Sequence, residues 1–104
     1  MVTVYRGVHA EHPQLPNALR GQAEPMGGHS NPLLHNQGDN ASIYTSWTTE
    51  RSVAEGIARS NGPGGVVLEQ TVPRSSLVPS PDLLQELEVL RVGPIEGATQ
   101  TVVK

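Results

Sequence analysis

The first residues of the chain alternate between core-forming and outward-facing types, which is typical of a strand with one buried face. Residues 2–6 are β-prone, and Gly7 is expected to break the strand. A second β-prone run covers 43–47, and a third covers 65–72. Residues 98–103 complete the pattern as a possible last strand.

Helical spacing first becomes clear after the second of these strands. The apolar positions of the stripe are Val53, Ala54, Ile57 and Ala58. Thr48 or Thr49 has the side chain to cap this helix, and Gly62 follows an asparagine at its expected end. A shorter helix is expected over 14–21, with Gly21 at its stop.

Residues 80–91 fit two structures. Pro81 suits a first helical turn, and the leucines that follow it have helical spacing. The alternative is a turn followed by a strand over 86–92, in which Glu86 and Glu88 share one face. The local pattern favours the helix, and both structures remain open.

The region between residues 9 and 42 has little periodicity and many prolines and glycines. A long loop of this kind is usually functional or disordered. Its small polar residues have the chemistry to line a pocket; they are His29, Asn31, His35 and Asn36.

Length and composition fit one domain over residues 1–104 with a modest core. The chain has no cysteine, which excludes disulfides and cysteine-ligated zinc. The net charge of −3 counts mildly against a nucleic-acid partner. No apolar run approaches the roughly 20 residues that span a bilayer, so no membrane partner is expected.

His9 and His12 have a spacing that suggests a metal pair only on a helix, and Pro13 follows them at once. No carboxylate-rich segment completes such a site. We therefore expect no metal.

Three separated motifs carry the functional signal. The first is Tyr-Arg-Gly at 5–7, and the second is Ser-Trp-Thr at 46–48. The third is Glu-Leu-Glu at 86–88, with Gly93 behind it. In this order they resemble the Arg–Ser–Glu class of mono-ADP-ribosyltransferases, which has Ser-Thr-Ser at the second motif. The chain looks most like the small toxin domains at the C-termini of bacterial polymorphic (Rhs-type) effectors.

The resemblance implies an α+β fold, a split β-sandwich of two small perpendicular sheets with one or two helices. It implies a transferase that uses NAD as its substrate. Glu88 would stabilise the positive charge that develops on the ribose when nicotinamide leaves. Arg6 would bind the pyrophosphate or ribose region, and Ser46 would orient the glutamate.

The remaining motif residues have supporting roles in this interpretation. Glu86 would act on the incoming nucleophile, and a glutamate there resembles the members that modify arginine. Gly7 would let the ligand approach the backbone, because it lacks a Cβ. Thr48 would brace the two strands. Trp47 is assigned to the NAD site with them, although a core position is the more common one for a lone tryptophan.

The resemblance also implies a biological setting. The domain would be secreted or injected by one bacterium, act in the cytoplasm of a rival cell, and be blocked by a cognate immunity protein. A protein arginine is the favoured acceptor. Transfer to RNA, hydrolysis of NAD, and a non-catalytic interaction module remain as alternatives.

Overall fold

The computed structural model of the chain describes residues 1–25, 44–79 and 88–104. Within these ranges the fold is α+β, with two α-helices, a 3₁₀ turn and one antiparallel sheet in the order β4-β5-β2-β1-β3-β6. The strands are β1 (Val2–Val8), β2 (Tyr44–Thr48), β3 (Val66–Val72), β4 (Val78–Pro79), β5 (Glu88–Val92) and β6 (Thr99–Val102). The helices are α1 (Leu15–Ala18) and α3 (Arg51–Ala58), and the 3₁₀ turn is Arg74–Ser76.

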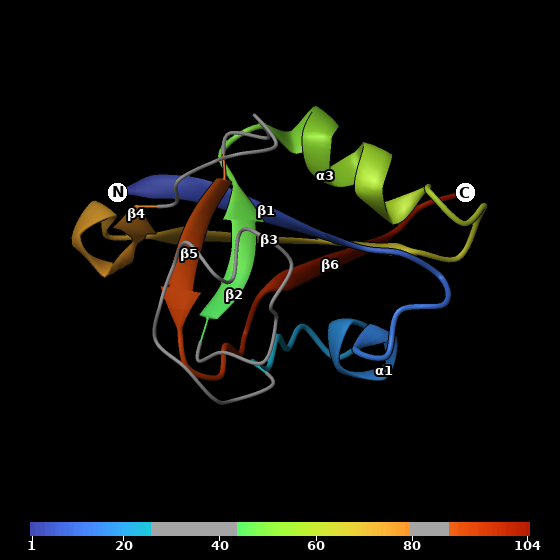
Figure 1. Cartoon of the computed structure of the whole chain (residues 1–104), viewed down its shortest axis with the longest axis horizontal. Coiled ribbons are helices and arrows are strands. Elements are labelled where there is room, and N and C mark those ends of the chain that lie inside the picture. The colour runs from blue at the N-terminus through green and yellow to red at the C-terminus, as the bar shows by residue number, and fades with distance from the viewer. Residues whose placement is uncertain (26–43, 80–87) are drawn as a thin grey trace.

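The sheet consists of two halves that meet at one point. β1 pairs with β3 along its whole length, from Val2–Val72 to Val8–Val66. By contrast, β1 and β2 are paired only through Tyr5 and Thr48. Figure 1 shows the consequence: β2 and β5 run steeply across the direction of β1 and β3. The described strands thus form one open sheet, where the resemblance implies two small sheets, and a single residue pair joins its two halves.

Hydrophobic side chains cover both faces of the β1–β3 half. On one face Val4 and Val8 belong to the larger core cluster, which includes Trp47 and Ala18 of α1. On the other face α3 packs against β1 and β3, and its Ala54 and Ala58 form a smaller cluster with Val67 and Val103. Since side chains alternate along a strand, Arg6 projects to the side of the larger cluster, while Tyr5 and Gly7 project to the side of α3.

Two sequence predictions for local structure are wrong. Gly7 does not end β1, because its pairing with Val67 continues the ladder to Val8. Neither Thr48 nor Thr49 caps α3, which has Glu50 at its N-cap and no side-chain cap bond. Thr48 instead accepts a hydrogen bond at Oγ1 from the Glu50 N–H, 3.1 Å away, within the turn that leads into the helix.

The ambiguous segment is a strand where the structure describes it. Glu88 to Val92 form β5, and the register with β2 runs from Thr48–Glu88 to Tyr44–Val92. The helix alternative is therefore wrong for 88–91. Glu86 and the loop residues His29, Asn31, His35 and Asn36 lie outside the described residues.

Among the described residues, no helix is long and apolar enough to cross a bilayer.

Candidate active site

A cavity of about 190 Å³ lies where the two halves of the sheet separate. It takes residues from β1, β2, β5, α3 and the loop that precedes α1. The lining residues are Tyr5, Arg6, Gly7, His12, Ser46, Trp47, Thr48, Val53, Ile57 and Glu88. The three motifs thus meet at one place, although more than 80 residues separate Arg6 from Glu88.

Arg6 bridges the opening between β1 and β2. Its Nη1 donates a hydrogen bond to the main-chain carbonyl oxygen of Ser46 at 3.0 Å. This bond joins β1 to β2 two residues before Thr48, the residue of β2 that pairs with Tyr5. Burial lowers the pKa of Arg6 to about 10, and the negative charge of Glu88 raises it in part. Arg6 therefore stays cationic at neutral pH.

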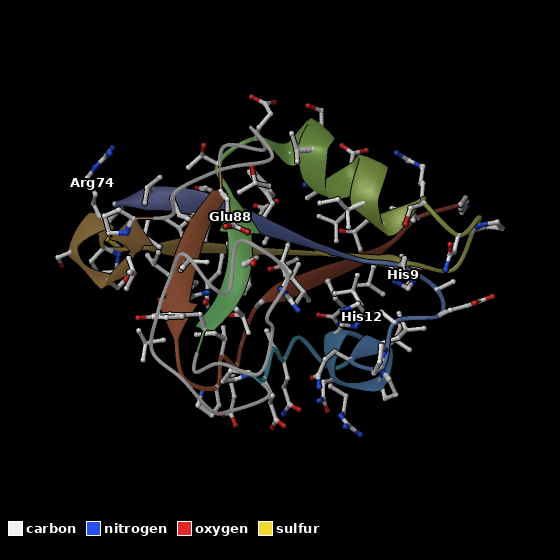
Figure 2. All side chains as sticks on the ribbon, in the orientation of Figure 1. His9, His12, Arg74 and Glu88 are labelled. Carbon is white, nitrogen blue, oxygen red and sulfur yellow. The ribbon has the colours of Figure 1, made fainter. Side chains whose placement is uncertain are left out.

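Glu88 begins β5 and lies directly across the ladder from Thr48. Ser46 pairs with Leu90, so it is on the same face as Glu88 and diagonal to it. Thr48 also pairs with Tyr5 on its other side, which makes it the residue that links β1, β2 and β5. The bracing role expected for Thr48 stays a prediction. Figure 2 shows Glu88 at the start of β5.

The opposite part of the cavity wall is apolar. Val53 and Ile57 come from successive turns of α3, and both are partly buried. Together with the cationic Arg6 and the acidic Glu88, they form a site with an apolar side and a charged side. Such a site suits a ligand that combines a flat or apolar ring with polar and charged oxygens.

With this geometry in view, the chain was compared with known proteins. No family model matched it, and no curated protein matched it.

Gly7 lines the cavity, but the space beside its Cα belongs to the protein. A Cβ at this position would overlap the carbonyl oxygen of Ala54 and lie 2.9 Å from Cβ of Ile57. The glycine is thus required for the close approach of α3 to β1. The volume that a Cβ would take is filled by α3, and the assignment of Gly7 to the NAD site stays a prediction.

Trp47 borders the cavity, but its side chain is a core residue. It is only 2% exposed and belongs to the larger core cluster. Its Nε1 donates a hydrogen bond to Oγ1 of Thr45 at 2.9 Å, and the Arg91 guanidinium lies 4.7 Å from the centre of its ring. These contacts hold the indole in place, and its assignment to the NAD site stays a prediction.

His12 is a cavity residue that the sequence interpretation missed. In the sequence, the spacing of His12 from His9 suggests only a metal pair. Among the described residues, no group of three or more potential ligand side chains is placed to hold a metal ion. The two rings instead meet edge to face with centres 5.2 Å apart, and His12 alone reaches the cavity. Its position in a loop left no periodic signal by which to find it.

Proposed function

We propose that this chain is a mono-ADP-ribosyltransferase that uses NAD. The observation that carries the proposal is the convergence of Arg6, Ser46 and Glu88 on one cavity. These residues come from three strands and from three motifs that were selected on the sequence alone. The α+β fold, with β1 and β2 paired at a single position beside the cavity, supports the proposal.

The chemistry of the cavity suits cleavage of the bond between nicotinamide and ribose. Departure of nicotinamide leaves positive charge on the ribose, and a carboxylate held near it stabilises that charge. Glu88 supplies this carboxylate. Arg6, with its planar fork of N–H donors, supplies a cation for the pyrophosphate oxygens.

The size of the cavity suits one end of the dinucleotide. Pockets that enclose a whole ligand usually measure about 300–1,000 Å³. The present cavity, with about 190 Å³, is smaller than this, so it would take one end of the dinucleotide and not the whole. The nicotinamide ring would lie against Val53 and Ile57, and the ribose hydroxyls would face Glu88.

Transfer of label from NAD tests the proposal. The purified chain is incubated with labelled NAD and a bacterial cell extract, and the label in macromolecules is counted. We expect transfer by the wild type and a loss of about 10²–10³ in rate for Glu88→Gln. Glu96→Gln is the matched control, because Glu96 is exposed and does not line the cavity. Equal rates for wild type and Glu88→Gln would contradict the proposal.

The same experiment separates the possible acceptors. Label that is lost with protease and stable to nuclease supports a protein acceptor, for which arginine is favoured. Label that resists protease but not nuclease indicates RNA. Free ADP-ribose formed without extract indicates an NAD glycohydrolase. No turnover of NAD, together with toxicity that survives Glu88→Ala, supports the interaction module.

Toxicity in a rival bacterium is the biological part of the proposal. Expression of the wild type in a bacterial cytoplasm should stop growth, and Glu88→Ala should not. A cognate immunity protein would then act by covering the cavity, so its binding should exclude NAD.

A further inference from the structure

His12 lies in the loop between β1 and α1, on the wall of the cavity that also holds Arg6. Figure 2 shows it between the end of β1 and α1, on the other side of β1 from α3. None of the three motifs includes it, and the proposed chemistry has not used it.

One ring nitrogen of His12 is already engaged. The main-chain N–H of Gln14 donates a hydrogen bond to Nδ1 of His12 at 2.9 Å. A neutral imidazole has one nitrogen that accepts and one that donates. Because Nδ1 accepts, the proton of neutral His12 must be on Nε2.

The surroundings of His12 keep the ring neutral. Burial, the positive charge of Arg6 and then His9 lower the pKa of His12 below its ordinary value. Across the cavity Glu88 is the acidic group, while α3 contributes only the apolar Val53 and Ile57 to the wall. At neutral pH the ring is therefore uncharged, and its Nε2–H can donate a hydrogen bond.

We propose that His12 donates a hydrogen bond from Nε2 to an acceptor oxygen of the ligand bound beside Arg6. The inference rests on the proposed function, in which that ligand is NAD and the oxygens nearest Arg6 belong to its pyrophosphate. Arg6 supplies the charge, and His12 supplies a directional donor that adds no second cation. Since Nε2 already carries its proton, His12 binds the ligand and does not act as a general base.

Calorimetry with two probes, NAD and inorganic pyrophosphate, tests the role of His12. We expect His12→Ala to weaken binding of both probes by about tenfold or more, as for a lost hydrogen bond to a charged oxygen. His12→Gln keeps an amide donor and should lose less. Glu11→Ala is the control from the same loop and should bind within about twofold of the wild type, because Glu11 is exposed and does not line the cavity.

Nitrogen NMR of the wild type tests the same inference without a variant. We expect a neutral ring at pH 7.5 with hydrogen on Nε2 and none on Nδ1. A protonated ring, or hydrogen on Nδ1, would overturn the inference even if His12→Ala failed to fold.

The outcomes for His12 and for the proposed function are distinguishable. Equal NAD affinity for wild type and His12→Ala overturns the inference and leaves the transferase proposal standing. If the wild type does not bind NAD, the transferase proposal fails. The binding of pyrophosphate then decides the inference about His12. Weaker binding by His12→Ala than by the wild type supports the inference. Equal binding by the two proteins, or no binding by the wild type, overturns it.

Discussion

The guanidinium of Arg6 donates a hydrogen bond from Nη1 to the main-chain carbonyl of Ser46, 3.0 Å away. This contact joins the first motif to the second across the opening in the sheet. It also explains why an arginine on the core side of β1 tolerates burial, since a backbone oxygen and the charge of Glu88 compensate part of its lost hydration. The side chain that connects β1 and β2 across the opening thus also lines the cavity.

Arg6→Lys is expected to weaken NAD binding by about tenfold to a hundredfold. Lysine keeps the charge but loses the fork that can bond Ser46 and a phosphate oxygen together. Calorimetry measures the affinity. Arg59→Lys is the control, because Arg59 pairs with Glu55 on the exposed side of α3. Equal affinities for Arg6→Lys and wild type would show that the fork is not used.

Gly7→Ala is expected to destabilise the fold by about 1–3 kcal/mol. The added methyl group would overlap the Ala54 carbonyl, so α3 must move away from β1. Urea unfolding measures the change. Gly56→Ala is the opposite control, since a Cβ there meets nothing within 4 Å in the helix, and it should stabilise by about 0.5–1 kcal/mol. Wild-type stability in Gly7→Ala would disprove the close contact.

Thr45→Val is expected to lower the free energy of unfolding by about 1–3 kcal/mol, because it leaves the buried Nε1 of Trp47 without its acceptor. Trp47→Phe removes the donor and also some core volume, so it should destabilise too. Because the two residues share one hydrogen bond, the double variant should lose less free energy of unfolding than the sum of the losses in the two single variants. Urea unfolding of the four proteins gives this comparison, and strict additivity would contradict the bond.

The stability of the protein should fall as the pH drops below about 6.5. The pKa of His12 is lowered in the folded state, so the unfolded chain binds the proton more readily. The contribution of neutral His12 to the free energy of unfolding is fully present above the pKa of His12 in the unfolded chain. It is lost as the pH falls from that value through the lower pKa of the folded state. Urea unfolding at pH 7.5 and 5 measures it. His12→Gln should show a smaller difference between the two conditions, and an unchanged difference would rule out this source.

The sequence by itself determined the local elements and the order of the motifs. Alternation and β-branched residues placed strands near 2–6, 43–47 and 65–72, and the apolar stripe placed α3, because these patterns depend only on near neighbours. The resemblance of three motifs to one enzyme family selects Arg6, Ser46 and Glu88 as a set.

Tertiary structure decided what near neighbours left open. Residues 88–91 satisfy both helical and strand spacing locally, and pairing with β2 makes them a strand. Gly7 is fixed by the backbone of α3, which packs against it from a distant part of the chain. His12 lines the cavity because its loop lies beside Arg6. A loop has no hydrophobic periodicity from which this position could be predicted. In each case the deciding contact joins segments far apart in sequence, where patterns of adjacent residues carry no information.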